Sequence, residues 1–201
     1  MNSRDMGGAV ERGDFRQRLL EALEMSIAQD GYAGTTVADI VRRARTSRRT
    51  FYQHFQSREA CFVALHSEAN ADQVSQISNA VDPSLPWQKQ VRQAVEAWIS
   101  SGESRPALTL SWIRDVHALG AAARGLQRDA MQNFVDMVAA LGNTEEFRAA
   151  GIGPLSRQRI IMLLGGLREL TAITVEEGGR MSDVTEEAVD ASIALLSPQR
   201  G

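Results

Sequence analysis

Apolar residues recur every three or four positions along most of the chain, a spacing that is typical of amphipathic helices. Between residues 35 and 55 the pattern consists of two short stripes with three intervening residues. The first stripe occupies positions i, i+3, i+4 and i+7, held by Val37, Ile40, Val41 and Ala44. In the second stripe, Phe51 and Phe55 lie one helical turn apart. The pattern predicts two short helices joined by a tight turn.

Polar residues at the starts of both stripes support this prediction. Thr36 precedes the first helix as an N-cap, and Asp39 three residues later completes a shortened capping box. Arg45 and Thr46 interrupt the apolar pattern, and Ser47 then caps the second helix. The positions of the second helix that face away from the packing are all hydrogen-bond donors: Arg48, Arg49, Thr50, Tyr52, Gln53 and His54.

Two short helices with an apolar inner face and a donor-rich outer face describe a helix-turn-helix. The local charge favours a nucleic-acid partner, because no acidic residue lies between Ile40 and Arg58. The arginines of this stretch are Arg42, Arg43, Arg45, Arg48, Arg49 and Arg58. A duplex is a dense line of phosphates that such a field attracts. The alternative is a solvated cationic helix pair on an ordinary bundle.

Charge is divided unevenly along the 201 residues, whose net charge is −3. Residues 1–66 hold ten arginines against eight acidic residues, whereas the remainder holds 12 basic against 17 acidic residues. Basic charge is therefore local to the first third, as expected when one module meets DNA and the other stays in solvent.

The segment from about Phe15 to Leu65 resembles the DNA-binding region of TetR-family transcriptional regulators. The family pattern is matched here by Thr36, Val37, Ile40, Ser47, Thr50, Phe51, Tyr52, His54 and Phe55. The sequence departs from the family in the turn, where Arg45 and Thr46 stand in place of the usual Gly and Val. Because Gly normally relieves a turn position, Arg45 raises the question of local strain in this turn.

The rest of the chain is expected to be helical, so the predicted fold class is all-α. We expect a flexible arm at residues 1–13 and a three-helix helix-turn-helix domain at residues 14–56, with Gly31 ending its first helix. The arm is either disordered without function or reaches an adjacent groove. Ser57 is the expected N-cap of a linking helix over residues 57–80, and Pro83 and Pro86 mark the domain boundary.

Residues 81–201 are predicted to form a helical bundle for effector binding and dimerisation. Its last two helices, at about 156–177 and 183–196, are apolar on more than one face, which requires burial on both sides. The resemblance implies a two-fold homodimer built from these helices. We assign its interface to Leu163, Leu167, Leu170, Ala188, Ala191 and Leu195. The alternative is that these helices fill a larger monomer core.

Two sets of DNA contacts follow from the predicted recognition helix. Arg48, Arg49 and Thr50 are expected to reach base edges, because Arg can bind guanine O6 and N7 together and the Thr methyl can touch a thymine methyl. The residues expected to hold phosphates, and so to set the register, are Thr36, Ser47, Tyr52, His54 and Arg58. The resemblance supports Tyr52 and His54 in this role, although a structural histidine is the alternative for His54.

TetR-like proteins typically sense a small molecule in the second domain, and the sequence contains side chains suited to such a pocket. The large or adaptable apolar candidates are Trp98, Trp112, Met131, Phe134, Met137 and Met162. Arg114, His117 and Glu169 are candidates to orient a polar group. For each of them the alternative is an ordinary core or surface position, and no pattern identifies the ligand.

Other function classes have no support in the sequence. No apolar run is long enough to span a membrane, and the first residues have no apolar segment of the kind a secretory signal needs, so we expect a cytoplasmic protein. The single cysteine, Cys61, excludes an internal disulfide and any multi-cysteine metal site. No glycine-rich phosphate loop and no metal-ligand pair such as HExxH is present, so neither an enzyme nor a cofactor is expected.

These observations predict a DNA-binding regulator, by family default a repressor, that binds a palindromic operator as a homodimer and is released by a small-molecule effector. The alternative is a helical protein-interaction module whose front end binds double-stranded DNA without sequence preference.

Overall fold

The computed structural model describes residues 3–198, with side chains from residue 14 onward except at 117, 118, 121 and 122. The described part of the chain is helical and contains no strand. It folds into two compact units: the described residues of 1–68 and 110–126 form the first, and those of 69–109 and 127–201 form the second.

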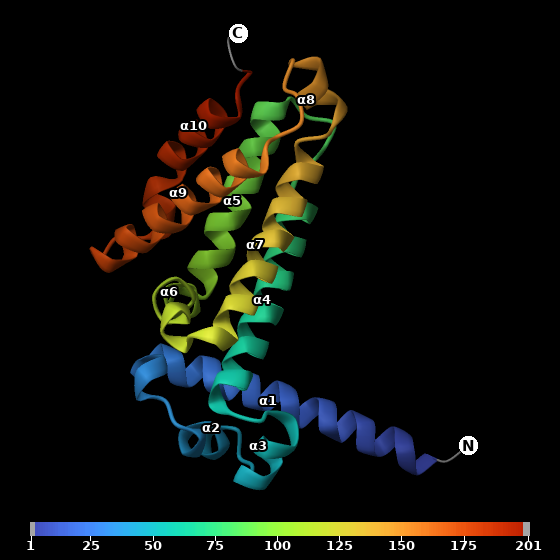
Figure 1. The fold of residues 1–201 in the computed structure, drawn as a ribbon, viewed down its shortest axis with the longest axis vertical. Coiled ribbons are helices and arrows are strands. Elements are labelled where there is room, and N and C mark those ends of the chain that lie inside the picture. Colours follow the sequence, from blue (N-terminus) through green and yellow to red (C-terminus); the bar gives the residue numbers. More distant parts are fainter. Residues whose placement is uncertain (1–2, 199–201) are drawn as a thin grey trace. The chain divides into compact units, whose positions relative to one another are not determined.

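The first unit contains a long helix and two short ones that pack against one another (Figure 1). These are α1 (Ser3–Gly34), α2 (Val37–Arg43) and α3 (Arg48–His54). Regular helical geometry is broken at Gly31, whose φ of 69° lies in the left-handed region, as the expected stop at this residue requires. Residues 3–13 are helical, which differs from the expected flexible arm, and residues 1–2 lie outside the described part.

Apolar side chains from all three helices and from the start of α4 (Arg58–Ala80) form the core of the first unit. The fully buried members are Leu19, Leu20, Leu23, Ile40, Phe51, Cys61 and Phe62. Full burial of a Leu or Phe side chain contributes about 1.5–3 kcal/mol each. Both predicted apolar stripes therefore face inward, and the outer face of α3 is left for solvent.

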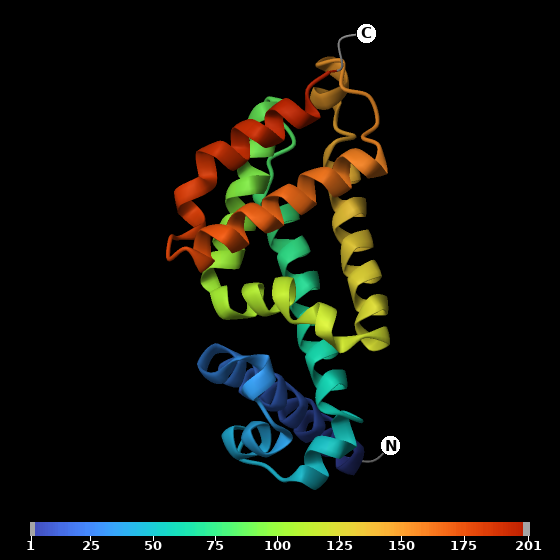
Figure 2. The ribbon, with the colours of Figure 1, turned by 60° about the vertical axis from the view of Figure 1, so that its left-hand side comes forward.

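The second unit is a helical bundle. Its elements include α5 (Trp87–Ser104), α7 (Ala121–Leu141), the short α8 (Glu145–Ala149), α9 (Arg157–Glu176), a 3-10 turn η2 (Met181–Val184) and α10 (Thr185–Leu196). Helix α10 packs against α5 and α9, as Figure 2 shows. Two aromatic contacts lock the bundle: Trp87 on Phe147, with ring centroids 5.7 Å apart, and Trp98 on Phe134, at 5.1 Å.

The division into units differs from the predicted domain boundaries. Helix α4 contributes residues to both units, consistent with its expected role as a link. Helix α6 (Pro106–Arg114) and the 3-10 turn η1 (Val116–Leu119) were expected in the second domain. Residues 110–126 instead pack with the first unit, where Trp112 lies against His66 of α4 at a centroid distance of 5.4 Å.

Candidate functional site

The start of α2 is held by a reciprocal capping box, as predicted. The Asp39 backbone N–H donates to Thr36 Oγ1 at 3.3 Å, and the Thr36 backbone N–H donates to Asp39 Oδ2 at 3.1 Å. The Thr36 hydroxyl also donates to Asp39 Oδ2, and Arg42 Nη2 donates to Asp39 Oδ1 at 2.9 Å. These hydrogen bonds, that of the Thr36 hydroxyl most of all, lower the pKa of Asp39 to about 2.

The turn between α2 and α3 is a Schellman motif with Arg45 at its left-handed position. The Thr46 N–H donates to Val41 O at 2.9 Å, and the Arg45 N–H donates to Arg42 O at 3.2 Å. Arg45 has a φ of 50° and is the only non-glycine residue with positive φ in the described part of the chain. The backbone is strained at this residue, because an L side chain costs free energy in a conformation that Gly adopts freely.

Helix α3 presents a donor-rich face to solvent. Ser47 caps it by accepting a hydrogen bond from the Thr50 N–H at 3.1 Å, as predicted. Phe51 and Phe55 are buried beneath it, 0% and 5% exposed. Of the outward positions, four are exposed and two half-buried: Arg48, Arg49, Tyr52 and Gln53, then Thr50 and His54. The buried aromatic pair therefore fixes which face of α3 is available for DNA.

Several arginines of the basic stretch are used inside the protein. Arg43 donates from Nε to Ser26 Oγ at 3.1 Å and from Nη2 to Gln29 Oε1 at 2.7 Å, which ties α2 to α1. Arg18 of α1 donates to the carbonyl oxygen of Ala44 at 2.5 Å. These hydrogen bonds satisfy groups at the end of α2 and hold the turn against α1.

Arg58 is also committed within the protein. Its Nη1 donates to the carbonyl oxygens of Tyr32 and Thr35, at 3.2 and 2.5 Å. Its guanidinium lies 4.3 Å from the ring centroid of Tyr32, within cation–π range. The start of α4 is thereby tied to the connection between α1 and α2. This use of the donors does not favour the expected phosphate contact for Arg58.

Of the six arginines of the basic stretch, three have guanidinium groups without a partner among the residues that the structure describes: Arg45, Arg48 and Arg49. All three residues are exposed and lie within five consecutive positions of the chain. In the sequence, all six arginines of the stretch contribute the same positive charge. The structure separates them, because the partners of Arg43 and Arg58 lie in distant parts of the sequence.

The other expected phosphate contacts have mixed surroundings. Tyr52 is 57% exposed, and its ring stands edge-on to that of Phe51. The hydroxyls of Thr36 and Ser47 accept the N-cap hydrogen bonds of α2 and α3, and both residues are exposed to solvent. His54 is half-buried, with its ring 6.4 Å from that of Phe55.

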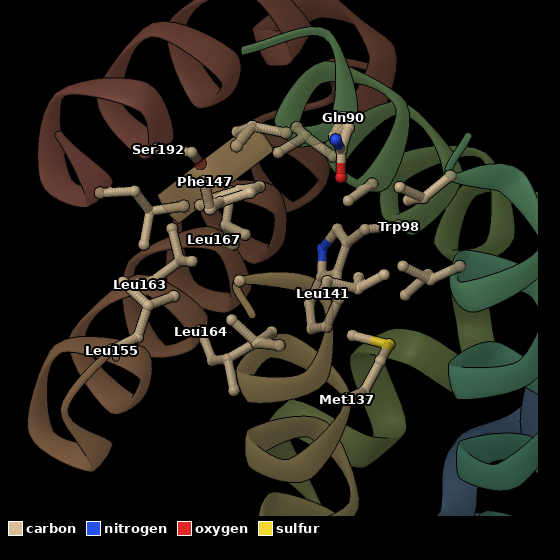
Figure 3. Close-up of a pocket in the computed structure, with 18 residues that line it drawn as sticks. Gln90, Trp98, Met137, Leu141, Phe147, Leu155, Leu163, Leu164, Leu167 and Ser192 are labelled. Carbon is tan, nitrogen blue, oxygen red and sulfur yellow. The ribbon is translucent and has the colours of Figure 1, made fainter. Parts of the chain in front are cut away.

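An apolar cavity of about 60 Å³ lies within the second unit (Figure 3). It is lined by residues of α4, α5, α7, α9 and α10 and of the α8 region, among them Ile77, Ala94, Trp98, Met137, Leu141, Phe147, Leu155, Leu163, Leu164, Leu167 and Leu196. Two polar residues, Gln90 and Ser192, also line it. Gln90 Nε2 donates to the carbonyl oxygens of Pro83 and Leu85, and Ser192 Oγ donates to Ala188 O. The accessible wall of the cavity is apolar.

Only two of the nine residues that we expected in the effector pocket line this cavity, namely Trp98 and Met137. Trp112 and Arg114 belong to the first unit, whereas Phe134 and Met131 pack in an apolar cluster next to the cavity. Met162 is 66% exposed and Glu169 is half-buried on α9. The His117 side chain lies outside the described residues. The aliphatic residues that dominate the wall had no distinguishing signal in the sequence.

The expected dimer residues also divide between core and surface. Leu167 and Ala188 are buried within the protomer, 8% and 1% exposed, so they do not face solvent. Leu163, Leu170 and Leu195 are half-buried, and Ala191 is exposed. Three apolar residues on α9 that were not assigned to the dimer interface are exposed, namely Ile161, Met162 and Ile173; Met162 was expected in the effector pocket. Their exposure to solvent distinguishes them from the other apolar residues of α9, whereas their spacing in the sequence does not.

Cys61 is buried without an exposed surface, and burial raises its pKa to about 12. A neutral, inaccessible thiol is a structural group, since reactivity requires an accessible thiolate. No cluster of histidine, cysteine and carboxylate side chains suited to a metal occurs among the described residues. No described helix combines the length and apolar character needed to cross a membrane.

Comparisons with known proteins agree with this geometry. Residues 19–65 match the family model described as "Bacterial regulatory proteins, tetR family". This segment comprises the second half of α1, all of α2 and α3, and the start of α4. A search of curated proteins found no match.

Similar solved structures cover nearly the whole chain. The transcriptional regulator FadR from Bacillus subtilis, solved in complex with stearoyl-CoA, has a TM-score of 0.77 at 14% identity and covers 92% of this chain and 99% of its own. Reduced NemR from E. coli has a TM-score of 0.71 at 14% identity, with 92% and 100% covered. A TetR-family regulator from Marinobacter aquaeolei VT8 has a TM-score of 0.71 at 16% identity, with 99% and 100% covered.

The family model thus coincides with the capped helix pair and its supporting helix, and the structural likeness extends the same fold through the helical bundle. Residues 19–65 therefore match the DNA-binding region of the tetR family of bacterial regulatory proteins, and the fold of the chain is similar to that of solved TetR-family regulators.

Proposed function

We propose that this protein is a homodimeric transcriptional repressor that binds a palindromic operator and is released from it by an apolar effector. The observation that carries the DNA-binding part is the exposed, unpaired pair Arg48 and Arg49 on the outer face of α3. Exposed guanidinium groups at the start of a recognition helix are placed to bind guanine edges in the major groove.

Surface properties of α9 support the homodimer. Ile161, Met162 and Ile173 are 38%, 66% and 43% exposed, although a solvent-facing helix position normally carries a polar residue. A Cβ added at Gly165 or Gly166 would meet no atom of the protomer within 4 Å, so a second backbone could approach there. An isologous contact through this face gives the two-fold symmetry that a palindrome requires.

The cavity supports an effector that buries hydrocarbon. Its accessible wall is apolar, and the side-chain donors of Gln90 and Ser192 are engaged with backbone carbonyls. A charged group would lose its hydration there without gaining a partner. FadR from Bacillus subtilis, which shares this fold, was solved with stearoyl-CoA. We infer that any polar head group of the effector stays outside the cavity.

The small size of the cavity supplies a mechanism for release. A volume of about 60 Å³ is well below the ~300–1,000 Å³ of typical ligand pockets, so an effector must displace lining residues. Ile77 of α4 is one of them, and the same helix carries Arg58 and Phe62 of the first unit. A ligand that fits only the expanded bundle shifts the population toward it. Release follows when that state holds the two recognition helices at the wrong spacing.

Selection of bound fragments from a random DNA pool tests the operator claim. We expect a palindromic consensus whose half-sites lie about 34–36 Å apart. Salt-sensitive binding without sequence preference would instead support a helical interaction module with a non-specific DNA-binding front end. Failure of the purified protein to bind any duplex at low salt would contradict the proposal entirely.

Titration of decanol into the protein–operator complex tests the effector claim, with glutamate as a polar control. Decanol should release the DNA and glutamate should not. The Ala94→Phe variant fills the cavity from α5 and should bind the operator but lose the response to decanol. Equal release of wild type and variant would show that the cavity is not the effector site.

A further inference from the structure

We propose that Arg45, in the turn between α2 and α3, contacts a DNA phosphate beside the recognition helix and adds one charge contact per protomer. This inference rests on the proposed function, because it requires α3 to bind a duplex. The family pattern has glycine at this position, so its usual residue offers no side chain for a phosphate contact.

The left-handed backbone conformation of Arg45 costs conformational free energy. Its φ of 50° lies where glycine is favoured, at the left-handed position of the Schellman motif. Arg18 donates to the carbonyl oxygens of Ala44 and Arg45, at 2.5 and 3.4 Å, and holds the turn in this conformation. A strained residue that its surroundings hold in place is commonly found at functional sites.

The side chain at this turn is free to act outside the protein. Arg45 is exposed and has no partner among the described residues. It precedes the capping Ser47 by two positions and the outward-facing Arg48 by three. Residues that flank a recognition helix meet the sugar-phosphate backbone at the groove edge, where Arg binds phosphate through charge-assisted hydrogen bonds.

Arg43 provides a matched control in the same stretch of chain. Its guanidinium is committed to Ser26 and Gln29 of α1, so its removal should weaken the fold and leave the number of phosphate contacts unchanged. For Arg45 we expect the opposite: its removal should stabilise the fold and remove one phosphate contact. Its replacement by glycine removes both the backbone strain and the charge.

The test compares wild type, Arg45→Gly, Arg45→Lys and Arg43→Ala on a labelled duplex of random sequence over a series of salt concentrations. Arg45→Gly should melt at a higher temperature than wild type yet bind the duplex several-fold more weakly. Its log–log salt slope should be smaller by about 0.9 for each protomer bound. Arg45→Lys should retain the wild-type slope, because the positive charge remains.

Arg43→Ala should melt at a lower temperature with an unchanged salt slope. If Arg45→Gly keeps the affinity and the slope of wild type, Arg45 makes no phosphate contact and the inference fails, while the regulator function stands. If Arg45→Gly loses affinity with an unchanged slope, the residue acts through the shape of the turn and the inference also fails. If wild type binds no duplex, the proposed function itself fails.

Discussion

Arg58 Nη1 donates a hydrogen bond to the carbonyl oxygen of Thr35 at 2.5 Å, across 23 positions of the sequence. The same nitrogen reaches the Tyr32 carbonyl, and the guanidinium covers the Tyr32 ring. Thr35 is itself buried, 1% exposed, directly before the capping residue of α2. The first residue of α4 thus fixes the connection that positions the helix-turn-helix.

The first prediction concerns this contact. Arg58→Ala should lower the free energy of unfolding by about 1.5–3 kcal/mol, the range for hydrogen bonds to a charged donor. Chemical denaturation measures this effect. DNA binding by the folded variant should keep its wild-type salt slope, because the side chain is used inside the protein. A smaller slope with unchanged stability would return Arg58 to the phosphate contacts expected from the sequence.

The second prediction concerns base recognition. Arg49→Ala should cost about 1–3 kcal/mol of operator binding and relax the preference for one base pair per half-site. Thermal stability should not change, since Arg49 is exposed and without a described partner. Competition binding with single-base operator variants measures the preference. Arg128→Ala, which removes an exposed arginine of α7, is the control and should leave operator binding unchanged.

The third prediction concerns the exposed apolar face of α9. Met162→Glu should convert a dimer into a monomer, because it places a charge in the proposed contact. Light scattering coupled to size-exclusion chromatography measures the mass, and operator binding should weaken with the loss of the dimer. Ala139→Glu, at an exposed position of α7, should remain dimeric. A dimer that persists in Met162→Glu would place the interface elsewhere.

The fourth prediction concerns pH. Hydrogen bonds from Thr36 and Arg42 lower the pKa of Asp39 from 3.8 to about 2. A depressed carboxyl pKa stabilises the fold above the unfolded value and loses that effect as pH falls through the folded value. Wild type should therefore melt above Asp39→Asn at neutral pH, and the difference should shrink between about pH 4 and pH 2. A difference that is constant over this window would exclude the ionised cap.

The fifth prediction concerns the thiol. Cys61 is fully buried, and burial holds its pKa near 12. Iodoacetamide should alkylate the folded protein slowly and the denatured protein rapidly, as mass spectrometry can follow. Cys61→Ala should bind DNA before and after mild peroxide treatment as wild type does. Rapid alkylation of the native protein would contradict a purely structural thiol.

The helix-turn-helix was predictable from the sequence because its determinants are local. The Thr36 cap, the Asp39 partner and the Ser47 cap act over three residues, and Phe51 and Phe55 are one turn apart. For Arg45 the sequence only raised the question of strain, and the positive φ of the residue in the structure answers it. Hydrogen bonds over such short separations form in the same way in any surroundings that permit the helices.

The effector cavity was not predictable in the same way. Aromatic and charged residues were expected to form it, and only Trp98 and Met137 do so. Its walls come from segments as far apart as Ile77 and Leu196. Periodicity shows that a leucine faces a core, but the void between five helices depends on how side chains of many elements pack together.

Sequence alone determined that the chain is all-helical and where its recognition helix starts. Tertiary structure decided which arginines remain free for DNA. Arg43 and Arg58 look identical to Arg48 and Arg49 in the sequence, yet their donors are used by groups 14 to 26 positions away. Charge is a property of the residue type, whereas its availability depends on which acceptors the fold brings within hydrogen-bonding distance.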